Sequence, residues 1–190
     1  MAEKDLFKVK TGVCRLSYPN LFTAKKNDDD KDKYGCVLLI PKTDKATIAA
    51  VNAAVEAVRL DDASLKKWDM KAAPKTIKSP LRDADAENEN EPEKHGEEYA
   101  GCYFINASSG QKPGVITRNG TDAIEAQVYA GCYVKASLRM YPFNFKGNKG
   151  VSAGLQNILL WSDGVPLAGR SRAADDFAED IDETGDNLLE

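Results

Sequence analysis

The sequence predicts a mainly β protein, a small β-barrel of short strands with one α-helix. Several segments alternate apolar and polar residues with the period of two that a half-buried strand requires. Turn-forming residues separate these segments at short intervals. Only one stretch, from Lys45 to about Leu60, repeats its apolar residues at helical spacing. With 190 residues, 42% of them hydrophobic, the chain is sized for one packed core.

The first expected strand runs from Leu6 to Tyr18, with Gly12 as a bulge that exchanges its inward and outward faces. Basic side chains on this strand are candidate contacts for a polyanion, although exposed bases on a strand are common without any such role: Lys8, Lys10 and Arg15. A loop is expected from Pro19 to Lys33. Its three adjacent aspartates lack the spacing of a calcium loop, so we interpret them as a solvated hairpin tip: Asp28, Asp29 and Asp30.

A nearly continuous apolar run, Tyr34 to Ile40, predicts a central strand. Asp44 is the expected N-cap of the helix that follows. Residues 61–82 are rich in bases around Trp68, which fits either a nucleic-acid arm or an ordinary connector. Residues 83–98 contain eight acids, one lysine and almost no hydrophobic residues, which predicts a mobile acidic loop.

Two further strands begin with the same five-residue word, one at Tyr99 and one at Tyr129. The third position of each word is a glycine, Gly101 or Gly131, which would let another backbone approach closely. The flanking residues do not match, so the repeat indicates a shared local need rather than a duplicated domain. A last strand is expected from Val151 to Trp161.

Charge is strongly segregated along the chain. The net charge is −4, yet Asp175 to Glu190 contains eight acids and no base. Without this stretch and residues 83–98, the remainder holds 25 bases against 14 acids. We therefore expect a basic domain, residues 1–165, followed by a disordered acidic tail, residues 166–190.

The most informative strand runs from Cys132 to Tyr141, and one of its faces is wholly apolar. The other face combines rings, cations and a hydroxyl without any acid: Tyr133, Lys135, Ser137, Arg139 and Tyr141. Cations neutralise phosphate, and flat rings stack on unpaired bases. The same residue types continue in a looser segment beyond Pro142: Phe143, Phe145, Lys146 and Lys149. Alternatively, the tyrosines only cover the sheet and the lysines only keep it soluble.

The sequence marks no catalytic, metal or cofactor site. It has one histidine, His95, and neither a GxSxG motif nor a Walker-type glycine loop. Its four cysteines lie far apart in apolar runs, which indicates buried thiols in a reducing compartment. No apolar run is long enough to span a membrane, and residues 1–10 lack a signal-peptide core. We therefore expect an intracellular protein without a membrane partner.

The acidic tail suggests a regulatory role in a nucleic-acid binder. A flexible polyanion attached to a cationic groove would compete there with the phosphate backbone. Hydrophobic residues within the tail would then bind partner proteins, whereas a tail that only solubilises the protein is the alternative. The residues expected to bind a partner are Asp175, Asp176, Phe177, Glu179, Asp180, Ile181, Asp182 and Glu183.

Five segments between roughly Val13 and Trp161 resemble segments of a known protein family: Arg15-Leu16-Ser17-Tyr18, Leu38 to Lys42, Tyr99 to Ser109, Pro113-Gly114-Val115 and Gly150 to Leu155. The segment from Tyr99 to Ser109 is the most specific of them. They resemble a family of tailed-phage proteins that includes a single-stranded DNA-binding protein with an OB fold. The resemblance implies an OB-type barrel and single-stranded DNA as the partner. The tail ends in Leu189-Glu190 rather than in the phenylalanine of some similar tails, which leaves its partner open.

We therefore predict a non-enzymatic OB-type protein that binds single-stranded DNA with little sequence preference, because stacking and Coulomb attraction do not identify bases. Replication or recombination proteins would bind its tail. The sequence does not decide between a monomer and a homo-oligomer. One alternative is an adaptor whose acidic segments bind basic partners, and another is a small metal-dependent nuclease or hydrolase. The predicted nucleic-acid-binding residues are Tyr133, Lys135, Arg139, Tyr141, Phe143, Lys146, Lys149, Lys8, Lys10, Arg15 and Tyr103.

Overall fold

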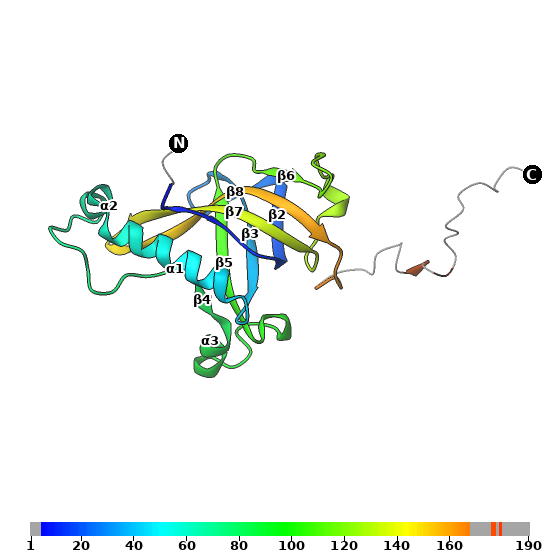
Figure 1. Cartoon of the computed structure of the whole chain (residues 1–190), viewed down its shortest axis with the longest axis horizontal. Coiled ribbons are helices and arrows are strands. Elements are labelled where there is room, and N and C mark those ends of the chain that lie inside the picture. The colour runs from blue at the N-terminus through cyan, green and yellow to red at the C-terminus, as the bar shows by residue number, and fades with distance from the viewer. Residues whose placement is uncertain (1–4, 168–175, 178, 180–190) are drawn as a thin grey trace, which may run out of the picture.

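A closed five-stranded barrel is the centre of the computed structural model (Figure 1), which describes residues 5–167, 176–177 and 179. Each barrel strand pairs with the next, and the last pairs with the first. The strands β5 (Cys102–Ser109) and β8 (Asn148–Ser162) are parallel, and the other pairs are antiparallel. The predicted OB-like barrel is confirmed. In order around the barrel, its strands are β2 (Cys14–Lys26), β3 (Asp32–Pro41), β5, β8 and β7 (Tyr133–Phe145).

Shorter elements are added at the margins of the barrel. The strand β1 (Lys8–Lys10) pairs with β7, β4 (Arg82–Asp83) pairs with β5, and β6 (Gly114–Ile116) runs parallel to β8. Two short 3-10 helices, η1 (Glu97–Tyr99) and η2 (Glu125–Gln127), lie in the connections.

The bulge predicted at Gly12 is confirmed, and it divides the expected first strand into β1 and β2. Between Lys10 and Cys14 the chain advances four residues, while the paired residues on β7 advance three, from Ser137 to Val134. The extra residue is held by the helix, because the Gly12 amide donates to Thr47 Oγ1 at 2.7 Å. On both sides of the bulge, the basic side chains therefore point outward and the hydrophobic side chains point inward.

The loop expected over residues 19–33 is mostly strand. After Ser17, β2 continues to Lys26 through two register shifts, and β3 begins at Asp32. The shifts interrupt the alternation of side chains, which hid the strand in the sequence. Only the turn at residues 27–31 remains, and the three aspartates at its tip are exposed, as predicted.

The helix α1 (Lys45–Leu60) has its predicted bounds, and Asp44 caps it by accepting from the Thr47 amide at 3.0 Å. It packs against β7 and β1 through its buried face, which includes Val51, Val55 and Val58. Two shorter helices, α2 (Asp62–Lys67) and α3 (Ala84–Asn90), were not predicted. Within the described residues, no helix has the length and apolar character needed to cross a membrane.

Trp68 is an anchor rather than part of a nucleic-acid arm. Trp68 directly follows α2, and its side chain is fully buried. Its Nε1 donates to Phe143 O at 3.0 Å and to Gly150 O at 3.2 Å. These two carbonyls belong to the β7–β8 hairpin, so the indole fixes the connector to the end of the barrel. Of the two interpretations of residues 61–82, the anchored connector describes Trp68 correctly.

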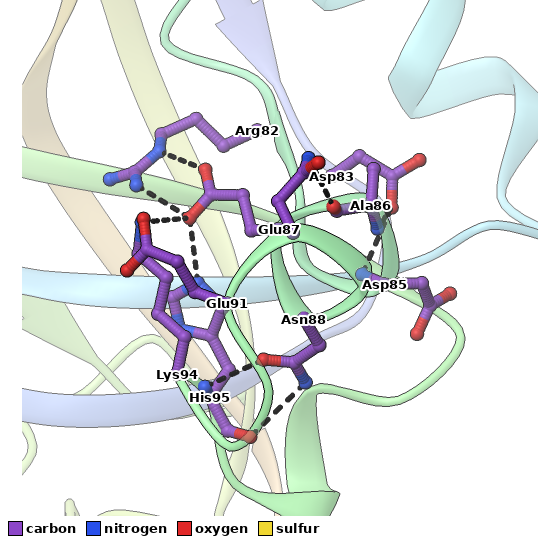
Figure 2. A network of polar contacts seen from close by, with 10 residues as sticks. Arg82, Asp83, Asp85, Ala86, Glu87, Asn88, Glu91, Lys94 and His95 are labelled. Atoms are coloured by element: carbon purple, nitrogen blue, oxygen red, sulfur yellow. Dashed lines mark hydrogen bonds and ion pairs between the residues drawn. The ribbon is translucent and has the colours of Figure 1, made fainter.

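The acidic segment 83–98 contains helix α3 and a network of ion pairs, so its prediction as a loop is wrong. Figure 2 shows Glu87 beside Arg82, which donates to it at 2.7 Å, and His95, whose Nε2 lies 2.8 Å from the carboxylate. Burial opposes ionisation of Glu87, but these hydrogen bonds outweigh it and lower its pKa to about 2. On the other side of α3, Lys42 Nζ lies 2.7 Å from both Asp83 and Asp85.

Four hydrophobic side chains hold the acidic segment against the outer surface of β3 and β5. Ala84 and Tyr99 pack with Leu39 and Phe104 in a buried cluster separate from the barrel interior. The His95 ring completes the cluster, with its centroid 4.8 Å from that of Phe104. Too few hydrophobic residues carry this contact for a composition-based analysis to find it.

The repeated five-residue word has two different structural causes. Gly131 adopts φ +114°, and a Cβ there would lie 2.2 Å from Val165 O, which confirms the predicted close backbone approach. Gly101 also has a positive φ, +69°, but open space surrounds the position of its missing Cβ. At Gly101 the prediction of a close approach is wrong, and backbone conformation alone favours glycine.

Candidate nucleic-acid interface

The strand β7 has one buried and one exposed face, as its alternation predicted. Its inward residues from Cys132 to Met140 are fully buried, whereas Tyr133 and Tyr141 on the outward face are 36% and 37% exposed. Opposite residues of an antiparallel pair project to the same side of the sheet. Because Lys8 lies opposite Arg139, Lys10 opposite Ser137, and Arg15 opposite Tyr133, three strands contribute to one surface. We call it the β7 outer face: Lys8, Lys10, Arg15, Tyr133, Lys135, Ser137, Arg139 and Tyr141.

Two residues that the sequence analysis did not select extend the β7 outer face. The ring centroid of Trp161 lies 4.0 Å from Lys135 Nζ and 4.3 Å from Arg118 Cζ. Trp161 is the extra residue of a bulge in β8, because Val134 pairs with Leu160 while Tyr133 pairs with Ser162. The indole thereby contacts two cations by cation–π attraction.

A second bulge in β8 places Gln156 beside the same face. Ser137 pairs with Asn157 and Leu138 with Leu155, so Gln156 is left without a partner on β7. A hollow of about 430 Å³ lies here, lined by Gln156, Asn157, Arg139, Tyr141 and Lys112 among others. One ring, two cations and several amides therefore line one concave region next to β7.

Two cations of the β7 outer face already have partners in their own chain. Arg139 forms an ion pair with Asp5, and its Cζ lies 5.2 Å from the Phe7 ring centroid. Both members of that pair are more than 40% exposed, so the attraction is weak and exchangeable for a phosphate. Arg15 donates from Nη2 to Val165 O at 2.7 Å, which makes it an anchor of the segment after β8.

A family model described as the single-stranded DNA-binding protein of Enterobacter phage Enc34 matches residues 7–188. The chain belongs to this family. Protein p50 (putative) of Acyrthosiphon pisum secondary endosymbiont phage 1 is 30% identical over 185 residues, which cover 92% of this chain and 94% of that protein.

Solved structures share the fold of this Enc34-family chain. The Enc34 protein in complex with single-stranded DNA has a TM-score of 0.71 and 22% identity, over 86% of this chain and 91% of that one. The single-stranded DNA-binding protein gp2.5 of bacteriophage T7 has a TM-score of 0.57 and 15% identity, over 94% and 96%. At these identities, the likeness establishes a common fold.

Four of the predicted site residues of the Enc34-family chain lie outside the β7 outer face as defined: Tyr103 and Lys149, which point elsewhere, and Phe143 and Lys146, which belong to the end of the β7–β8 hairpin. Tyr103 pairs with Ile40, which points into the core, and Lys42 Nζ lies 5.4 Å from the Tyr103 ring centroid. Lys149 pairs with Asn144, whose amide donates to Lys67 O on the opposite side of the hairpin. Side-chain alternation within each strand places Tyr103 and Lys149 away from the face.

Beyond Pro142 the chain is regular rather than loose, because β7 continues to Phe145. A two-residue turn closes the hairpin, with φ +48° at Lys146 and +81° at Gly147. Phe143 packs over Gly150, where an added Cβ would lie 2.6 Å from the ring. Phe145 is 56% exposed, so it is the more accessible ring at the hairpin tip.

A second group of rings and cations lies between β2 and β3. It lines a shallow hollow of about 300 Å³, and Tyr18 is 71% exposed there with a positive φ of +44°. The bulge in β2 produces this conformation, which the sequence analysis did not foresee. We call this group of rings and cations the β2–β3 cluster: Tyr18, Lys25, Lys26, Lys33 and Tyr34.

The prediction of buried thiols holds for three of the four cysteines. Cys14, Cys36 and Cys132 are buried, whereas Cys102 is only partly buried. Burial raises the pKa of Cys36 to about 12. The described part of the chain brings together no group of three or more metal-ligating side chains.

The predicted partner-binding tail is only marginally represented in the structure. Its residues Asp175, Asp180, Ile181, Asp182 and Glu183 lie outside the described residues. Asp176, Phe177 and Glu179 are described and exposed, with Phe177 at 57%.

Proposed function

We propose that this chain binds single-stranded DNA along the β7 outer face, without catalysis, during phage DNA replication or recombination inside the host cell. One observation carries the proposal: β1, β2 and β7 project rings and cations onto the same side of an OB-like barrel. Membership of the Enc34 family and the relative solved with single-stranded DNA support it.

The rings and cations of this face have complementary roles in the proposal. Tyr133 and Tyr141 stack on bases, each stack contributing about 1–3 kcal/mol. Lys135 and Arg118, each in contact with the Trp161 ring, neutralise phosphates. Neither contact identifies a base, so most of the affinity is independent of sequence.

The acidic segment is less suited to the alternative function of a basic-partner adaptor. Three of its carboxylates, those of Asp83, Asp85 and Glu87, already form ion pairs with Lys42 and Arg82. A basic partner would have to displace these internal cations before these three carboxylates could bind it.

Fluorescence anisotropy with labelled oligonucleotides tests the proposed function. We expect tight binding of oligo-dT and weaker binding of duplex DNA, with affinity for both falling as salt is raised. An absence of oligo-dT binding at low salt would refute the function outright.

A matched pair of lysine variants tests the location of the interface. Lys10→Ala removes an exposed cation from the β7 outer face, whereas Lys149→Ala removes one from the opposite side of the hairpin. We expect the slope of log affinity against log salt to fall by about 0.7 for Lys10→Ala only. Equal slopes for the two variants in anisotropy titrations would place the strand elsewhere.

We further propose that the acidic tail competes with DNA for the cationic surface and docks partner proteins when displaced. Deleting residues 175–190 removes eight acids, so we expect stronger oligo-dT binding at low salt. The gain should shrink as salt screens the attraction. Titrations of the full-length and truncated chains at two salt concentrations measure both effects, and identical affinities would exclude the competition.

A further inference from the structure

We propose that the hollow beside Gln156 is a subsite that reads the edge of one base in the bound strand. The proposal rests on the proposed function and adds a limited base preference to it. The hollow differs from the rest of the interface because it adds side-chain amides to the ring and the cations.

Amide groups are free at this hollow. Neither Gln156 nor Asn157 has a side-chain hydrogen bond to any residue that the structure describes. An amide presents a donor and an acceptor side by side, which complements the edge of a base, whereas phosphate oxygens only accept. A base edge can therefore use both groups of each amide, whereas a phosphate would use only the donor.

The bulge in β8 explains how two successive amides reach one hollow. A regular strand would send Gln156 and Asn157 to opposite faces. Because Gln156 is the bulged residue, both side chains line the hollow instead. Gly114 leaves room for the second amide, since a Cβ at this position would lie 2.7 Å from Asn157 Oδ1.

A buried hydroxyl on the strand opposite Asn157 is also without a hydrogen-bond partner, although its residue does not line the hollow. Ser137 lies opposite Asn157, and its Oγ is the one buried side-chain polar atom in the described residues that has no hydrogen bond. An unpaired buried hydroxyl costs free energy unless some partner satisfies it. A base edge at the amides would bring donors and acceptors next to this atom.

The surroundings supply the other contacts that a nucleotide needs. Tyr141 offers a ring, and Arg139 and Lys112 offer cations around the same hollow. Its volume of about 430 Å³ is at the lower end for ligand pockets, which suits a single nucleotide. Stacking, phosphate neutralisation and edge recognition thus converge at one position of the strand.

The test compares oligo-dA, oligo-dC and oligo-dT of equal length, bound to wild type and to Gln156→Ala/Asn157→Ala. For each oligonucleotide, the affinity of the variant is divided by the affinity of wild type. Differences in self-stacking among the free oligonucleotides cancel in this ratio, because they affect both proteins equally. We expect the double variant to lose affinity unequally, with at least about a fivefold difference between the most and least affected strands.

Three outcomes separate the possibilities. Equal losses for all strands, or no loss, would overturn the base-edge subsite while leaving DNA binding intact. Failure of wild type to bind any strand would instead refute the proposed function. Ser137→Ala gives an independent check, because we expect it to change the same ratios while leaving Tm unchanged or raised. Unaltered ratios for this variant would exclude the hydroxyl from the subsite.

Discussion

Replacing both Tyr133 and Tyr141 with alanine should weaken oligo-dT binding by about 30-fold or more, since each lost base stack costs about 1–3 kcal/mol. Both rings are more than a third exposed and lie outside the core, so the double variant should keep nearly the wild-type Tm. Anisotropy titration measures the affinity, and thermal unfolding checks the fold.

Tyr103→Ala is the matched control for this variant. Tyr103 lies away from the β7 outer face beside Lys42, so its removal should leave the affinity for oligo-dT unchanged. If the Tyr133/Tyr141 variant binds like wild type, the strand lies elsewhere. The β2–β3 cluster, with exposed Tyr18, would then be the surface to mutate next.

Trp68→Ala should lower the free energy of unfolding by about 3–5 kcal/mol, the usual cost of truncating a buried aromatic residue. The loss has two parts, because the cavity removes packing and because the carbonyls of Phe143 and Gly150 lose their donor. Urea denaturation followed by circular dichroism measures the change.

The second tryptophan provides the contrast. Trp161 lies on the outer face between Lys135 and Arg118, so Trp161→Ala should reduce DNA affinity more than stability. In Trp68→Ala, the remaining indole reports directly on the interface through its fluorescence. A Trp68→Ala protein as stable as wild type would show that the connector does not depend on this anchor.

Local signals in the sequence were sufficient for the helix and for the central strand of the site. Asp44 and the spaced valines define α1, because capping and helical periodicity act over a few residues. The alternation from Tyr133 to Tyr141 likewise assigned the two faces of β7 correctly. Gly12 was identified as a bulge because the phase of the alternation changes there.

Features that depend on distant partners were not predictable. The bulges that bring Gln156 and Trp161 to the interface exist only in the pairing of β8 with β7. The acidic segment folds because Lys42 binds two of its carboxylates and because Leu39 and Phe104 accept its few hydrophobic residues. Neither relation leaves a periodic pattern in the sequence.

The backbone contacts of residues 164–167 fix the point at which the chain leaves the barrel after β8. Arg15 and the Ala130 carbonyl bind the backbone of Val165 and Leu167, and a Cβ on Gly164 would lie 2.8 Å from the Tyr133 ring. The last described residues of the barrel therefore leave it alongside a ring proposed to stack on DNA. In the proposed competition, moving this exit point by circular permutation should change how strongly the acidic residues oppose DNA binding, although the composition of the chain stays the same.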